Sequence, residues 1–201
     1  AIITAAAVGT VLVGHSSGSA LTSGAGNTAV GYYAANGLTT ADSCIALGRG
    51  AMQVHTTGDN NIAIGDGAMD DTNHHANTLA STENIFIGLN SGGGTWQNNA
   101  CSYNVAIGNS TMDAGMDGAN ENVAVGHNAL SGITGGDLNT AMGTQAGEDL
   151  SSGAYNIAIG AQAMVQHTTG SSNIAIGAYC MDDTDVGGNS LNSDHNVFIG
   201  S

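Results

Sequence analysis

The chain has 201 residues, of which 32 are glycine, none is proline, 41% are apolar and only 8% are charged. One basic residue, Arg49, stands against 16 acidic ones, and the formal charge of −15 excludes an electrostatic surface for nucleic acid or for anionic membranes. No apolar run approaches the ~20 residues of a transmembrane helix, so no membrane insertion is expected. The many glycines disfavour helices and the apolar content disfavours disorder, which together predict an all-β chain with many tight turns.

The first segment, residues 1–14, is apolar but lacks the basic start of a signal peptide, so none is predicted there. From its end onwards, a glycine preceded by a small or branched apolar triplet returns regularly. Its positions are Gly14, Gly31, Gly48, Gly65, Gly88, Gly108, Gly126, Gly143, Gly160, Gly177 and Gly200. Six of the ten intervals equal the one from Gly14 to Gly31, which defines a seventeen-residue unit, and the longer ones indicate insertions into it.

A longer period lies above the shorter one. Subtracting 112 from the last five of these glycine positions returns the first five, and the inserted segments that begin at Met69 and Met181 correspond. The only two phenylalanines, Phe86 and Phe198, also occupy equivalent places. Residues 1–201 are therefore predicted to be one array, a window of a longer fibre, with super-repeats at about 14–125 and 126–201, the second incomplete.

Each unit is predicted to form one coil. Asparagine stands four residues before the glycine in nine of eleven units, and Ile or Val then alternates with Ala. Alternation with period two predicts a short strand with the branched residues on one face and Ala on the other. After the glycine, a small-apolar step such as Ala51-Met52 predicts a second short strand, and a polar turn such as His55–Gly58 closes the coil. Stacking of about eleven coils predicts a parallel β-solenoid.

The alanine column is predicted to face a partner chain, because we expect Ile and Val to form the inside of each coil. A row of methyl groups suits the close approach of another surface, which favours an oligomer. The alternative is a strand buried on both faces within one chain. The predicted interface residues are Ala29, Ala46, Ala63, Ala106, Ala124, Ala141, Ala158 and Ala175. The asparagine column is interpreted as a structural ladder of stacked amides or as turn caps.

Three stretches carry a family resemblance: "NTAVGYYA" from Asn27, "NVAVGHNAL" from Asn122 and "NIAIGAQAMVQHTTGSS" from Asn156. They resemble the "NTAVGYNAL" repeats of phage and virus tail fibres and the YadA-like head repeats of trimeric autotransporter adhesins. The resemblance covers the chain from about Val11 to Ser201 and implies a left-handed parallel β-roll in a homotrimer. The adhesin unit is shorter than the unit found here, and the basic neck that follows such heads has no counterpart.

Several side chains are candidates for chemistry. Adjacent carboxylates, which suit Ca²⁺, occur at Asp70-Asp71 and Asp182-Asp183; the alternative is that they are solvated loop residues. No other cofactor is expected. Candidate ligand contacts are His74, His75 and the single tryptophan, Trp96, which is an exposed carbohydrate contact or a loop anchor. Cys44, Cys101 and Cys180 match neither a zinc motif nor a disulfide framework. No nucleophile motif is present, so no enzyme is expected.

Two classes of function fit these features. The first is a structural segment of an extracellular or virion fibre, joined to further segments of that fibre, which forms a homotrimeric shaft or head and presents surfaces for attachment to a host receptor or glycan. The second is a filament-forming or surface-ordering solenoid that binds ice or glycans. An ice-binding face needs Thr-x-Thr in every coil, and paired threonines occur only at residues 39–40, 56–57 and 168–169. The fibre segment is therefore preferred.

Overall fold

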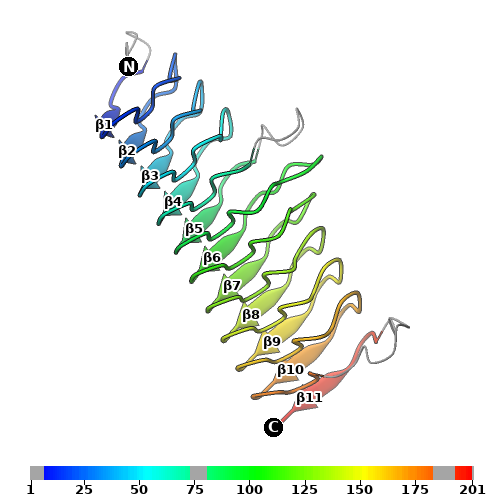
Figure 1. Ribbon diagram of the computed structural model, residues 1–201. Helices are drawn as coiled ribbons and strands as arrows, with labels where there is room; N and C mark the ends of the chain where they lie inside the picture. Colours follow the sequence, from blue (N-terminus) through cyan, green and yellow to red (C-terminus); the bar gives the residue numbers. More distant parts are fainter. Residues whose placement is uncertain (1–6, 73–80, 183–192, 201) are drawn as a thin grey trace.

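The computed structural model describes residues 7–72, 81–182 and 193–200, which form a rod of stacked coils (Figure 1). Each coil contributes one three-residue strand to a single parallel sheet of 11 strands, whose order in the sheet is the order in the chain. The strands are β1 (Val11–Val13), β2 (Thr28–Val30), β3 (Ile45–Leu47), β4 (Ile62–Ile64), β5 (Ile85–Ile87), β6 (Val105–Ile107), β7 (Val123–Val125), β8 (Thr140–Met142), β9 (Ile157–Ile159), β10 (Ile174–Ile176) and β11 (Val197–Ile199).

Equivalent positions of the repeat pair with one another along the whole sheet. Ile45 of β3 lies beside Ile62 of β4, one basic unit further on, and Ile62 lies beside Ile85 of β5 across one of the longer units. The longer units therefore leave the strand register unchanged. The predicted all-β parallel β-solenoid is confirmed, and so is the basic unit that the glycine spacing defined.

The repeated glycine follows each strand and has a backbone that only glycine adopts easily. Its φ lies between 131° and 143° in all eleven coils. From Gly14 to Gly160, a Cβ built on each of these glycines would lie only 2.1–2.5 Å from the carbonyl oxygen of the equivalent glycine in the next coil. Glycine is therefore required in this column for two reasons: the positive φ, and the close contact between the backbones of stacked coils.

The second strand predicted in each unit is not formed in the described residues; that segment turns instead. Met52 and Met69 lie in it with φ of 52° each, and both side chains are fully buried. A left-handed residue other than glycine costs about 1–2 kcal/mol, which burial of a methionine side chain offsets. The chain therefore reverses within a few residues and places a large side chain over the sheet.

The alternation within the strands is confirmed, but the prediction of which face is inside was wrong. All eight alanines predicted to contact a partner chain are at most 2% exposed and lie in the core of the single chain. The branched residues beside them point outward: Val13 is 55% exposed and Ile107 is 41% exposed. The returning segment of each coil passes close to the sheet. In most coils the inner face therefore has room only for the methyl group of an alanine.

Core volumes are matched within most coils, although Ala29 is followed six positions later by Ala35 and Ala141 by Gly147. The residue six positions after the strand centre is a glycine where the centre is large: a Cβ on Gly18 would lie 2.6 Å from Leu12 Cδ2, and one on Gly92 would lie 2.5 Å from Phe86 Cδ1. Where the centre is Ala124, the residue six positions on is Leu130, which is fully buried in the same core. Large and small side chains thus complement one another across the coil, as close packing requires.

In the described part of the chain, no helix is long and apolar enough to span a bilayer.

Candidate functional sites

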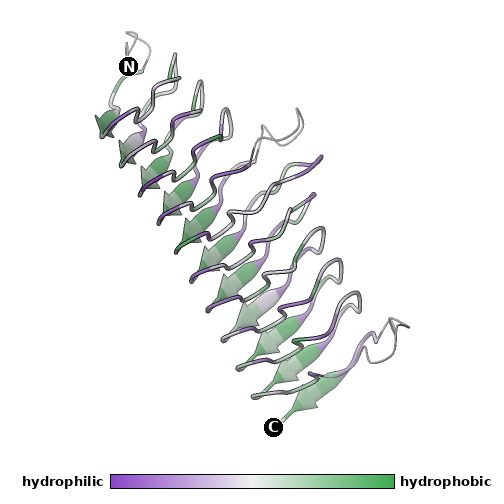
Figure 2. Cartoon of the chain, viewed as in Figure 1, coloured by the Kyte–Doolittle hydropathy of each residue, from purple (hydrophilic) through white to green (hydrophobic). Residues whose placement is uncertain are grey.

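The outward residues of the eleven strands form one continuous surface, which we call the aliphatic face. Figure 2 shows the hydrophobic strands aligned along the rod, with more hydrophilic turns beside them. The face consists of Val11, Val13, Thr28, Val30, Ile45, Leu47, Ile62, Ile64, Ile85, Ile87, Val105, Ile107, Val123, Val125, Thr140, Met142, Ile157, Ile159, Ile174, Ile176, Val197 and Ile199. It carries no charged residue, although the chain has a formal charge of −15.

The aliphatic face is larger than the scattered apolar exposure of an ordinary monomer. Eleven strands about 4.8 Å apart make it roughly 50 Å long, and three residues make it about 10 Å wide. A contiguous apolar patch of about this size is typical of an interaction surface. The sequence analysis identified the Ile and Val residues of this face but placed them in the core, so it did not predict the aliphatic face.

A second feature lies beside the strands, where a polar hollow of about 140 Å³ spans several coils. The side chains that line it belong to Tyr32, Arg49, Gln53, Asp66, Asp70 and Asn90. Backbone hydrogen bonds place the column of lining residues in consecutive coils: Gly50 N donates to Tyr32 O at 2.9 Å, and Gly67 N donates to Arg49 O at 2.9 Å. We call this recess the Tyr32 hollow.

An ion pair and two ring contacts fix side chains of the Tyr32 hollow. Arg49 donates from Nε and Nη2 to Asp66 Oδ2 at 3.0 and 2.9 Å, although both side chains are substantially exposed. The ring of His15 stacks on Tyr32 with centroids 5.4 Å apart, and Tyr33 packs edge-on against Tyr32 at 4.4 Å. The hollow therefore combines a held aromatic ring with an oriented ion pair.

Trp96, the candidate carbohydrate contact, is fully buried. Its ring packs edge-on against Phe86 with centroids 5.8 Å apart and an interplanar angle of 61°, and its Nε1 donates to Gly92 O at 3.1 Å. The prediction of a ligand contact is wrong, and the alternative interpretation as an anchor is confirmed. Gly92 leaves the space in which these two rings meet.

The other candidate ligand contacts, His74 and His75, and the candidate calcium ligand Asp183 lie outside the described residues. Asp70, Asp71 and Asp182 are each partly exposed. Residues 7–72, 81–182 and 193–200 contain no group of three or more His, Cys, Asp or Glu side chains that could hold a metal ion. Calcium binding therefore stays a prediction that rests on the paired carboxylates alone.

Asp70 is nonetheless an unusual carboxyl group. Burial, and then the negative charges of Asp71, Asp113 and Asp66, raise the pKa of Asp70 to about 6. The neighbouring Asp71 is engaged elsewhere, because Thr95 Oγ1 donates to its Oδ2 at 2.6 Å. Asp70 thus lines the Tyr32 hollow as a group that gains its charge only near neutral pH.

The asparagine column is a hydrogen-bonded ladder inside the rod, as predicted. From Asn84 to Asn196, each side-chain amide donates from Nδ2 to Oδ1 of the preceding asparagine at 3.0–3.2 Å. Each Oδ1 also accepts the backbone N–H of the next asparagine, as between Asn139 N and Asn122 Oδ1 at 2.9 Å. Cys44 interrupts the column, and its N–H donates to Asn27 Oδ1 at 2.8 Å. The ladder satisfies the hydrogen-bonding needs of buried polar groups.

His55 is packed against this ladder, which agrees with the interpretation of repeated histidines as turn residues. Its Nδ1 lies 2.9 Å from Thr72 Oγ1, and its Nε2 lies 2.9 Å from Gly58 O and 3.1 Å from Asn61 Nδ2. The equivalent His167 makes the same contact to Asn173 Nδ2 at 3.1 Å. Both side chains are buried and form part of the hydrogen-bonded interior of the rod.

Acid is expected to destabilise the coil that contains His55. Burial lowers the pKa of His55 from its ordinary 6.5, so below pH 6.5 the unfolded chain binds more protons than the folded one. Stability should therefore fall as the pH drops below 6.5. The melting temperature of His55→Gln should change less between pH 6.5 and about pH 5 than that of the parent chain. The exposed His127→Gln serves as the control and should keep the parent slope; an unchanged slope in His55→Gln would contradict the assignment.

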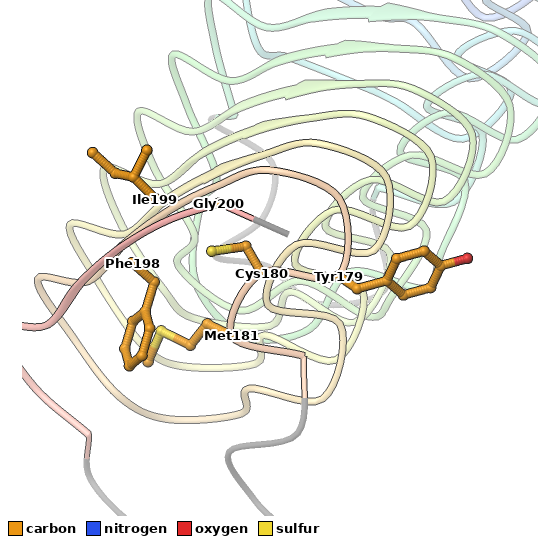
Figure 3. A pocket seen from close by; sticks show the side chains of 6 residues that line it. All are labelled: Tyr179, Cys180, Met181, Phe198, Ile199 and Gly200. Atoms are coloured by element: carbon orange, nitrogen blue, oxygen red, sulfur yellow. The ribbon is translucent and has the colours of Figure 1, made fainter.

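A further hollow of about 280 Å³ lies at the last described coil (Figure 3) and is lined by Tyr179, Cys180, Met181, Phe198, Ile199 and Gly200. In the first super-repeat the equivalent Phe86 is fully buried, with Gly92 and Trp96 of the same coil packed against it. Phe198 is 45% exposed. The hollow is thus the open end of the core column rather than a separate site.

No protein-family model, curated protein or solved structure matches the chain. The fold alone therefore defines its class, which is that of all-β parallel β-solenoid repeat proteins with one short strand in each coil.

Proposed function

We propose that this chain is a structural, non-enzymatic segment of an extracellular or virion fibre, in which three copies associate side by side through the aliphatic face. The observation that carries the proposal is the exposure of an uncharged row of branched side chains in every coil. The resemblance of the repeats to those of tail fibres and trimeric adhesins supports the same role. The turns, directed away from the joined faces, would present attachment surfaces to a host receptor or glycan.

The size of the aliphatic face suits self-association. Its flat footprint is about 10 Å by 50 Å, and the projecting side chains raise its accessible area towards the ~800 Å² per partner of a standard interface. Each square ångström of apolar surface removed from water contributes about 25 cal/mol. Because every coil adds to the same face, the association free energy grows with the number of coils.

The distribution of charge also favours a second copy of the chain as the partner that covers the aliphatic face. Elsewhere on the rod the excess of acidic residues repels a second copy, whereas the aliphatic face brings no charges together. Equal coil spacing in two parallel rods lets their side-chain rows interdigitate along the whole length. Three rods around one axis would bury their three aliphatic faces against one another in a closed symmetric assembly, as the resemblance to trimeric adhesins implies.

The oligomeric state tests this proposal. The parent chain should sediment at three times its mass of 19.7 kDa at micromolar concentration. Replacing Ile107 and Val125, two outward residues at the middle of the face, with glutamate should give a folded monomer, since buried carboxylates cannot be paired there. Circular dichroism verifies that the solenoid is retained.

Tyr155→Glu is the matched control, because it adds a charge at a side chain that is 62% exposed and lies outside the aliphatic face. This variant should remain a trimer. A monomeric parent chain, or an unchanged mass for the double variant, would overturn the proposed association. A dimeric mass would retain the face as the interface and reject the threefold arrangement.

A further inference from the structure

The Tyr32 hollow exists because two glycines replace side chains in one column. The second residue after the repeated glycine has a left-handed backbone in most coils and usually carries a side chain, as in Tyr33, Gln145 and Gln162. Gly50 and Gly67 occupy this column with φ of 67° and 64°. A Cβ on Gly67 would lie 2.6 Å from Asn90 Oδ1, and one on Gly50 would lie 3.2 Å from Gln53 Oε1. The recess is thus open where the column is normally filled.

The second super-repeat shows that the solenoid does not need these residues. When 112 is added to their positions, Tyr32, Arg49, Gly50, Gln53, Asp66 and Gly67 are replaced by Thr144, Ala161, Gln162, Val165, Ala178 and Tyr179, whereas Asp70 keeps its identity as Asp182. There Gln162 Nε2 donates to Gln145 Oε1 at 2.9 Å and fills the column. The scaffold residues are the same in both copies, for example Asn27 with Asn139 and Ala46 with Ala158. The hollow is therefore an addition to the scaffold rather than a part of it.

The lining groups match a ligand that carries several hydroxyl groups. Arg49, Gln53 and Asn90 supply hydrogen-bond donors, and the carboxylates of Asp66 and Asp70 supply acceptors. A sugar hydroxyl can donate and accept at the same time, so a mixed set of this kind serves it well. Tyr32 adds an aromatic surface for the C–H face of a ring, and its stacking on His15 fixes that surface in advance.

Charge and size narrow the choice of ligand. An anion would meet the carboxylates of Asp66 and Asp70, and a cation would meet the guanidinium of Arg49, which already occupies Asp66 Oδ2. A neutral ligand avoids both conflicts. The volume of about 140 Å³ is well below the ~300–1,000 Å³ of sites for drug-sized molecules, so it admits about one ring.

We propose that the Tyr32 hollow binds one sugar unit of a neutral glycan, with Tyr32 against the ring and Arg49, Asp66, Gln53 and Asn90 hydrogen-bonded to its hydroxyl groups. This proposal builds on the proposed fibre role, because it gives the fibre an attachment surface, but the binding itself does not depend on association of the chains.

Binding can be measured by saturation-transfer NMR with glucose, galactose, mannose, N-acetylglucosamine and N-acetylgalactosamine as free probes at millimolar concentration. At least one of them should bind the parent chain. Two variants borrow residues from the second super-repeat, so both are compatible with the coil. Gly67→Tyr fills the hollow with the residue found at position 179, whose φ is 57°, and Tyr32→Thr removes the ring. Each should weaken binding by about tenfold or more.

Tyr155→Asn replaces an exposed tyrosine outside the hollow with a residue that tolerates the left-handed φ of 59° at that position, and it should leave binding unchanged. The proposal is overturned if none of the five sugars binds, if Gly67→Tyr binds as well as the parent chain, or if sialic acid, an anionic sugar, binds more tightly than all of them. Sedimentation of the same samples separates the two proposals. A monomer that binds sugar would reject the fibre assembly alone, and a trimer that binds none would reject the sugar site alone.

Discussion

Replacing Gly126 with alanine is expected to disrupt the rod at β7 and to lower the free energy of unfolding by more than about 3 kcal/mol. The φ of Gly126 is 138°, a conformation that costs a residue with a Cβ about 1–3 kcal/mol. In addition, the new Cβ would lie 2.4 Å from Gly143 O, and this oxygen belongs to the backbone of the next coil. Neither coil can move without losing the strand register on both sides. Urea unfolding followed by circular dichroism measures the effect.

Gly118→Ala separates the two causes. Gly118 lies between β6 and β7 with a φ of 85°, but a Cβ there would approach nothing closer than Asn99 Cβ at 3.4 Å, an ordinary contact distance. This variant bears the backbone strain without the clash, so it should be far less destabilised than Gly126→Ala. Equal losses in the two variants would show that strain alone explains the glycine column and that contact between coils is irrelevant.

Replacing Asn122 with aspartate is expected to be almost as damaging, although the two side chains have the same shape. Asn122 is fully buried, and its Nδ2 donates to Asn104 Oδ1 at 3.2 Å and to Gly136 O at 2.8 Å. An aspartate oxygen in that position would face two acceptors and carry an unpaired charge. The expected loss at pH 7 is about 3–5 kcal/mol.

The pH dependence gives this variant a distinct signature. Burial raises the pKa of the introduced carboxyl, so the folded state binds its proton more tightly than the unfolded state does. The difference in melting temperature from the parent chain should therefore shrink as the pH falls. Asn109→Asp is the control, because Asn109 is exposed and uses only its Oδ1, as the acceptor for Leu89 N at 3.1 Å. If the difference in melting temperature between Asn122→Asp and the parent chain stayed constant as the pH was lowered from 7, the buried-charge explanation would be contradicted.

The sequence predicted the fold well because the repeat makes each constraint visible eleven times. The glycine column, the asparagine ladder and the strand positions all followed from spacing. The assignment of the two strand faces failed, because alternation shows that two faces differ without showing which one is inside. Ranking Ile above Ala in hydrophobicity gave the wrong answer, since the thickness of the coil decides how large an inner side chain can be.

The sequence nevertheless indicates which strand face is inside, through the pairing of residue sizes within a coil. Phe86 is followed six positions later by Gly92, and Leu12 by Gly18, whereas Ala124 is followed by Leu130. Such compensation is expected only between residues that share a limited volume, so it identifies the strand centre as the inner position.

The Tyr32 hollow was missed for a different reason. Its residues lie in separate coils, and none of them matches a known motif. The useful signal was the difference between the two super-repeats at positions where the fold has no requirement, together with the location of the only basic residue, Arg49. In a repeat protein, positions at which equivalent units differ are better guides to binding than positions at which they agree.

The asparagine ladder also gives the rod an electrical direction. Every amide from Asn84 to Asn196 donates towards the first coil, so the side-chain dipoles add along the axis. The backbone bonds of the sheet alternate in direction and largely cancel, as between Thr28 N to Cys44 O and Gly31 N to Val13 O. The first coils therefore form the positive pole and the last coils the negative pole, an arrangement otherwise familiar from the α-helix. The field of this dipole is parallel to the dipole along the rod axis and antiparallel to it beside the rod. A copy that follows along the axis and a copy that lies alongside therefore experience fields of opposite direction.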